Sequence, residues 1–130
     1  MNIFVDTSYY IARTLVNDQW RAAAAKATRA DLRFVTSAPV INETVSLMQK
    51  RGYVSGALAF LSETRGNPDL QIVYVDPNLQ SEAWDLFNRF AGSGANAVDC
   101  ISFAIMRRMS IKKAFTFDRH FRSAGFEILG

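Results

Sequence analysis

The sequence has few of the residues that form disulfides, bind zinc or restrict the backbone: among 130 residues it has one cysteine, one histidine and three prolines. The lone Cys100 excludes a disulfide framework and a four-thiolate zinc site, and the lone His120 excludes any site that needs two histidines. No apolar run approaches membrane-spanning length, and Asp6 interrupts the N-terminus too early for a signal peptide. These absences predict a soluble protein of a reducing, cytoplasmic compartment, with Cys100 as a small buried side chain.

Net charge is also low. It is only +3, which permits a polyanionic partner without requiring one. Hydrophobic residues make up 49% of the chain and charged residues 21%, which is ordinary globular composition. No repeat, linker or low-complexity tract divides the sequence. We therefore expect a single domain over residues 1–130 with a real hydrophobic core.

Strand-like and helix-like patterns alternate along the chain. Apolar runs predict strands at residues 2–6, 32–37, 70–76, 112–118 and 126–130. Helical spacing and alanine content predict helices at 7–16, 19–30, 40–51, 54–64, 79–91 and 98–109, with a turn at 119–125. The alternation predicts an α/β fold: a three-layer α/β/α sandwich around a mainly parallel central sheet of four to five strands.

Four carboxylates fall where a parallel sheet would gather them. Two directly follow apolar strands and two lie near the starts of helices; they are Asp6, Glu43, Asp99 and Asp118. The carboxyl ends of parallel strands share one rim, and ligands of such folds bind there. Residues far apart in the sequence are therefore expected to converge in space.

Taken singly, each acid has a structural alternative. An aspartate after a strand can cap the next helix, and an acid in a first helical turn interacts favourably with the helix dipole. Asp76, which is followed by Pro77, also ends a predicted strand, and we interpret it as a turn residue. Taken together, four crowded carboxylates repel one another, and a divalent cation would remove that conflict. Oxygen ligands favour a hard ion, Mg²⁺ or Mn²⁺, over zinc.

Four segments resemble the successive motifs of the PIN-domain ribonucleases, most closely the small VapC-like members, many of which are toxins of toxin–antitoxin pairs. The segments are FVDTSYYIA, INETVSLMQKRG, AVDCISFAIMRRMSI and AFTFDRHFRSAGFEIL, in the family order and at family-like spacing. The likeness spans nearly the whole chain. It departs from the family at Asn96-Ala97-Val98, where relatives often carry Ser or Thr, and at Gln19-Trp20, where a histidine is common.

The resemblance implies a site of four acids. It makes metal ligands of Asp6, Asp99 and Asp118, and a ligand or water-positioning base of Glu43. Thr7 or Ser8 matches the hydroxyl residue that often supports the first acid. Mg²⁺ or Mn²⁺ is the implied cofactor, and the sequence does not say whether one or two ions bind.

The implied activity is endoribonucleolytic hydrolysis of single-stranded or looped RNA by a metal-activated water. Arg119 or Arg13 could hold phosphates near the rim. The family also implies an antitoxin partner and a homodimer. An apolar group is compatible with a dimer face or with ordinary core: Tyr9, Tyr10, Trp20, Phe60 and Leu61.

Other functions fit the residues less well. A non-catalytic PIN-fold module that binds RNA or protein is the main alternative. An aspartyl-nucleophile phosphatase needs a second Asp where Ser8 stands, and a phosphate-receiver module needs a late-strand lysine where Asp118 stands.

Overall fold

A computed structural model of the chain describes residues 1–15 and 32–129. The predicted helix at 19–30 lies outside these residues. In chain order the elements are β1 (Asn2–Val5), α1 (Thr7–Leu15), β2 (Arg33–Ser37), α3 (Ala38–Lys50), α4 (Val54–Gly66), β3 (Leu70–Val73), α5 (Pro77–Phe90), the short 3-10 helix η1 (Ala91–Ser93), α6 (Ala97–Arg108), β4 (Lys113–Phe115), α7 (His120–Ser123) and β5 (Glu127–Leu129).

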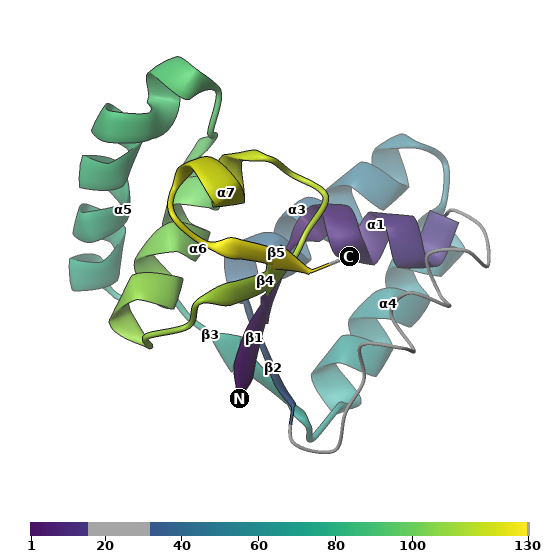
Figure 1. Cartoon of the computed structure of the whole chain (residues 1–130). Helices are drawn as coiled ribbons and strands as arrows, with labels where there is room; N and C mark the ends of the chain where they lie inside the picture. The colour runs from purple at the N-terminus through teal and green to yellow at the C-terminus, as the bar shows by residue number, and fades with distance from the viewer. Residues whose placement is uncertain (16–31, 130) are drawn as a thin grey trace.

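The five strands form one parallel sheet in the order β3-β2-β1-β4-β5. Helices cover both faces, with α1 and α4 on one side of the strands and α5 and α6 on the other (Figure 1). The predicted α/β sandwich with a parallel sheet is therefore confirmed. The chain winds from β1 to β2 to β3 and then crosses to β4 on the opposite side of β1. This reversal beside β1 is a topological switch point, where α/β folds open a crevice.

The core is centred on β1 and α6. The side chains of Ile3, Phe4 and Val5 are at most 3% exposed, as expected for a central strand covered on both faces. Helix α6 is buried continuously from Asp99 to Met106. It includes Cys100, which is a free, buried thiol, as predicted.

The strands end where their hydrogen-bonded partner strands end, and not where the apolar runs in the sequence end. Strand β3 ends at Val73 and not at residue 76, because its partner β2 ends opposite it at Ser37. Strand β4 ends at Phe115 and not at residue 118, because Val5 and Leu129 are the last partners on either side. An apolar run marks a strand but does not fix how far the hydrogen-bonded ladder extends.

Two turn predictions were wrong. Asp76 is the N-cap of α5: its Oδ1 accepts a hydrogen bond from the Leu79 amide at 2.7 Å, and Pro77 occupies the first turn. The helix therefore begins before the predicted residue 79. In the predicted turn at 119–125, residues 120–123 form helix α7, which is anchored by the fully buried Phe121.

Three aromatic residues that were compatible with a dimer face belong to the core of a single chain. Tyr9 is stacked on Phe115 with ring centroids 4.8 Å apart, and Tyr10 meets Phe60 edge-on at 4.9 Å. Tyr9, Tyr10 and Phe60 are all buried, and Leu61 packs partly buried against the same core. Trp20 lies outside the described residues. In the part of the chain that the structure describes, no helix is long and apolar enough to cross a membrane.

Candidate active site

All four predicted acids line one cleft of about 460 Å³ at the carboxyl end of the sheet. They come from the loop after β1, from α3, from the start of α6 and from the loop after β4; the residues are Asp6, Glu43, Asp99 and Asp118. Thr7 and Ser8 line the same cleft. The structure thus brings together every residue that the sequence assigned to the site.

Asp6 is held by two hydroxyl groups, one from the first turn of α1 and one from the loop after β4. Its Oδ2 accepts hydrogen bonds from Ser8 Oγ and Thr116 Oγ1, both at 2.9 Å, and these two hydroxyl oxygens lie 3.0 Å apart. The Phe117 amide donates to Ser8 Oγ, and the Asp118 amide donates to Thr116 Oγ1. Burial raises the pKa of Asp6 even though these hydrogen bonds favour its charged form. The network therefore locks the position of a carboxylate that is costly to ionise without a cation.

Glu43 projects from α3, whose start is defined by the Ser37 N-cap, which accepts from the Val40 amide at 3.2 Å. Burial raises the pKa of Glu43, and repulsion from Asp6 and Asp118 adds to the effect. A hydrogen bond from the Thr7 side chain acts in the opposite direction. Glu43 thus resembles Asp6: a neighbouring hydroxyl favours its charged form, yet burial still raises its pKa.

Asp99 opens α6 through a reciprocal capping box with Asn96. The Asp99 amide donates to Asn96 Oδ1 at 2.8 Å, and the Asn96 amide donates to Asp99 Oδ2 at 2.9 Å. Asn96, in the segment where the sequence departs from the family pattern, is thus the N-cap of α6. Yet the Asp99 side chain is only 5% exposed. Burial, reinforced by the other acids of the cleft, raises its pKa to about 7.

Asp118 is the most open of the three aspartates, with 27% of its side chain exposed. Its Oδ1 accepts a hydrogen bond from the His120 amide at 2.9 Å. The His120 imidazole turns back toward the same oxygen, so that Nδ1 lies 2.6 Å from Asp118 Oδ1 and 3.9 Å from Asp99 Oδ2. That buried Nδ1 makes no hydrogen bond with any described residue.

The capping alternative for Asp6 and Asp118 is thus partly correct, because each accepts a backbone amide of the helix that follows it. Asp99 lies in the first turn of α6, as the helix-dipole alternative requires. Capping alone does not explain the burial or the raised pKa of Asp6 and Asp99. Buried carboxylates that face each other across a cleft are a donor set that a hard divalent cation fits, since the cation stabilises their charged forms.

Sequence reasoning missed three members of the site. Thr116 is fully buried and donates to Asp6, and its only signal was its position two residues before Asp118. Arg51 lines the cleft from the end of α3, and its spacing of eight from Glu43 places both on one helical face. His120 was considered only as evidence against sites with two histidines. The predicted phosphate contact Arg119 is exposed, and the side chain of Arg13 lies outside the described residues.

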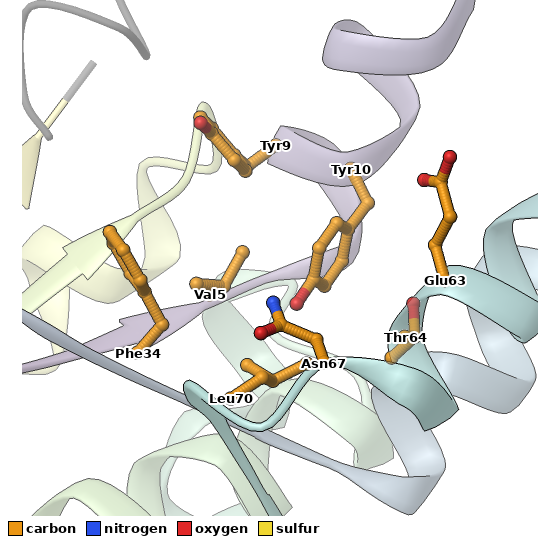
Figure 2. Close-up of a pocket in the computed structure, with 8 residues that line it drawn as sticks. All are labelled: Val5, Tyr9, Tyr10, Phe34, Glu63, Thr64, Asn67 and Leu70. Atoms are coloured by element: carbon orange, nitrogen blue, oxygen red, sulfur yellow. The ribbon is translucent and has the colours of Figure 1, made fainter.

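A second cavity, of about 280 Å³, is lined by none of the four acids and is shown in Figure 2. It is lined by Val5, Tyr9, Tyr10, Phe34, Glu63, Thr64, Asn67 and Leu70. Figure 2 shows the ring of Tyr10 pointing between Val5 and Asn67, with Glu63 at the margin. With a single carboxylate among its lining residues, this cavity offers no cluster of acids for a cation. Among the described residues, the cluster of acids that could bind a cation lies in the cleft at the carboxyl end of the sheet.

Comparison with known proteins bears on both the fold and the site. The PIN domain family matches residues 3–127. The chain is 32% identical over 125 residues to the 23S rRNA-specific endonuclease VapC20 of Mycobacterium tuberculosis, in strains CDC 1551 / Oshkosh and ATCC 25618 / H37Rv. The match covers 95% of each chain.

Solved structures extend the comparison. The crystal structure of M. tuberculosis VapC20, described as a sarcin–ricin loop cleaving toxin, superposes with a TM-score of 0.84 at 31% identity and covers 95% of each chain. FitAcB from Neisseria gonorrhoeae gives a TM-score of 0.69 at 16% identity, covering all of this chain and 97% of that one. A toxin–antitoxin complex from Klebsiella pneumoniae gives 0.62 at 14% identity, covering 90% and 87%. The last two likenesses concern the fold alone.

Proposed function

The chain belongs to the PIN-domain family, and we propose that it is a metal-dependent endoribonuclease of the VapC toxin type. The observation that carries the proposal is the convergence of four acids, from four separate segments, in one cleft. Because burial raises the pKa of three of these acids, Asp6, Glu43 and Asp99, a bound cation would stabilise their charged forms. Extensive likeness to an RNA endonuclease supports the same conclusion.

In this proposal Asp6, Asp99 and Asp118 hold Mg²⁺ or Mn²⁺. When bound there, the ion lowers the pKa of a water molecule and neutralises charge on the phosphate. Glu43 accepts a proton from the attacking water; its raised pKa brings its basicity closer to what general base catalysis near neutral pH requires. Arg51 supplies the positive charge in the cleft that holds a neighbouring phosphate.

The supporting hydroxyl groups act by position. Ser8 and Thr116 fix Oδ2 of Asp6, so that its other oxygen is not engaged by either of them. Thr7 links α1 to α3 by a long contact of 3.5 Å from its Oγ1 to the Val40 carbonyl, and it also supports Glu43. The two carboxylates are therefore held before substrate arrives, which reduces the cost of organising the site.

The substrate is RNA, and the sarcin–ricin loop of 23S rRNA, named for the relative VapC20, is the first substrate to test. A looped RNA is the expected form because folded RNA offers its bases for recognition mainly in single-stranded loops. We also propose an antitoxin partner, as in the toxin–antitoxin complex that shares the fold. A homodimer and a cytoplasmic location complete the proposal. The dimer is tested by light scattering of the purified chain.

The test of the reaction is the chemistry of the cut ends. Water attack on phosphorus expels the 3′ oxygen, so the products should carry 5′-phosphate and 3′-hydroxyl ends. The assay uses sarcin–ricin loop RNA with Mn²⁺, with Mg²⁺ and with EDTA. Cyclic 2′,3′-phosphate ends, or full cleavage in EDTA, would contradict metal-dependent hydrolysis. Tight RNA binding without cleavage by the intact protein would favour the non-catalytic alternative.

A further inference from the structure

The imidazole of His120 lies close to two acids of the cleft, Asp99 and Asp118, and the predicted ligand set does not include it. Its Nδ1 is buried and has no hydrogen-bond partner among the described residues, although Asp118 Oδ1 lies only 2.6 Å away. The contact is short, yet its geometry is not that of a hydrogen bond. A nitrogen lone pair so close to a carboxylate oxygen is repulsive unless a positive charge is shared between them.

The orientation of the ring is fixed by its surroundings. The opposite edge of the imidazole faces Gly94, where a Cβ atom would come within 2.9 Å of His120 Nε2. Gly94 adopts φ of +102°, which favours glycine, and it ends the short helix η1. Below the ring, α7 is anchored by the fully buried Phe121. The Gly94 backbone against Nε2 and the buried Phe121 beneath α7 restrict the ring, and Nδ1 faces Asp99 and Asp118.

The distances suit a shared ion. Ligand atoms of Asp99, Asp118 and His120 all lie within 4.8 Å of one another. Two atoms bound at about 2.1 Å to one ion can be no more than about 4.2 Å apart. The separations from His120 Nδ1, 3.9 Å to Asp99 and 2.6 Å to Asp118, fall within that limit. Only small adjustments are needed to bring the three atoms around a single cation.

We propose that His120 is a metal ligand through Nδ1 and that, with Asp99 and Asp118, it forms a site of one nitrogen and two carboxylate ligands that prefers Mn²⁺ to Mg²⁺. This inference rests on the proposed function, which places a cation in the cleft. Mg²⁺ favours oxygen ligands and gives up water reluctantly, whereas first-row transition metals accept imidazole readily. His120 therefore sets metal preference rather than metal binding as such.

The decisive experiment observes the nitrogen directly. His120 is the only histidine in the chain, so a protein prepared without a polyhistidine tag has one imidazole. Mn²⁺ is added to two samples, one unlabelled and one with ¹⁵N-histidine, and electron spin echo envelope modulation is recorded. We expect an imidazole nitrogen coupling that changes with the label. Mn²⁺ bound without such a coupling would overturn the ligand role and leave the nuclease proposal intact.

Binding measurements provide the second readout. We expect His120→Asn to weaken Mn²⁺ binding by about 10–100-fold, while Mg²⁺ binding changes little. Arg122→Ala, at an exposed position of the same short helix α7, is the control and should bind both ions like the wild type. An equal loss for the two ions would show that His120 only positions Asp118 and would contradict the proposal. If the wild-type protein binds no divalent cation, the proposed function itself fails.

The glycine that faces the ring gives a matched pair of variants. Gly94→Ala places a methyl group against Nε2, so it should displace the imidazole and weaken Mn²⁺ binding. Gly92→Ala meets no atom within 4 Å and should leave Mn²⁺ binding unchanged. Circular dichroism of both variants establishes that they are folded. If folded Gly94→Ala binds Mn²⁺ as tightly as the wild type, the proposal that His120 is a metal ligand held in place by Gly94 is contradicted.

Discussion

Asp6 and Asp76 follow apolar segments that both run toward the same edge of the sheet, yet they are in opposite physical states. Asp6 is 3% exposed, and burial raises its pKa. Asp76 is exposed; the Leu79 amide that it caps lowers its pKa, and the guanidinium of Arg108, 3.2 Å away, adds to this. The difference comes from strand order. β1 has a neighbour on both sides, whereas β3 is an edge strand, so a side chain beyond β3 reaches water.

The comparison shows why position in the sheet matters more than position in the sequence. Arg108 also approaches Glu82, at 3.4 Å, and such exposed ion pairs contribute little to stability. Among the described residues, Arg51 is the one arginine or lysine that lines the cleft of Asp6, and the imidazole of His120 lies 2.6 Å from Asp118 Oδ1. A carboxylate satisfied by protein cations needs no metal, whereas a carboxylate crowded by other acids does.

The largest expected difference between the two regions is in catalysis. Asp6→Asn, Glu43→Gln and Asp99→Asn should each reduce RNA cleavage by about 10²–10⁴-fold, because each removes a charge from a unit that acts together. Asp118→Asn should show the mildest loss of the four, since this side chain is the most open aspartate of the cleft. Initial rates on sarcin–ricin loop RNA measure the effect.

The controls for that assay come from the exposed region. Asp76→Asn and Asp85→Asn should cleave at the wild-type rate, since Asp85 lies on the exposed face of α5. Circular dichroism must first show that every variant is folded. A wild-type rate for Asp6→Asn, with contaminating nuclease excluded, would reduce Asp6 to a helix cap.

The next effect concerns metal and thermal stability. At a Mn²⁺ concentration about 100 times Kd, the melting temperature of the wild type should rise by roughly 10 °C through mass action. Asp99→Asn should lose most of this rise, while its metal-free form should be as stable as the wild type or more so, because a repelling charge is gone. Asp76→Asn should keep the full rise. An unchanged melting temperature of the wild type on addition of Mn²⁺ would contradict a shared metal site.

A smaller effect should appear in the pH dependence of the metal-free protein. Burial raises the pKa of Asp99 from 3.8 to about 7, so between these values the folded state binds more protons than the unfolded state. The free energy of unfolding should therefore fall as pH rises from about 4 to about 7. Chemical denaturation at several pH values measures this slope, and Asp99→Asn should flatten it. Equal slopes in the two proteins would mean that Asp99 is not the titrating group.

The smallest effect belongs to Asp76. Asp76→Ala removes the acceptor for the Leu79 amide and should lower the melting temperature by a few degrees. Asp76→Asn should leave it unchanged, because asparagine is an equally good N-cap. Differential scanning calorimetry distinguishes the two. A similar loss in both variants would point to the Arg108 ion pair instead of the cap.

Much of this architecture was readable from residue patterns, and what escaped them has physical causes. The order of elements and the convergence of the acids follow from alternating periodicities and from the rules of parallel sheets. The turn at residues 119–125 was misinterpreted because one helical turn, α7, is too short to show a period. Thr116 was missed because its role depends on Asp6, which is 110 positions away. A single histidine forms no sequence motif with a second one, so only the structure shows that the His120 imidazole lies beside Asp99 and Asp118.

The pairing of β1 with β4 also determines when the central sheet can be completed during translation. β1 leaves the ribosome well before its partner at Lys113–Phe115, which emerges about a hundred residues later. At roughly 5–20 residues per second, the N-terminal strand waits for several seconds with one edge open. Asp118 and His120 emerge later still. The acidic cleft therefore stays incomplete until translation of this segment is well advanced.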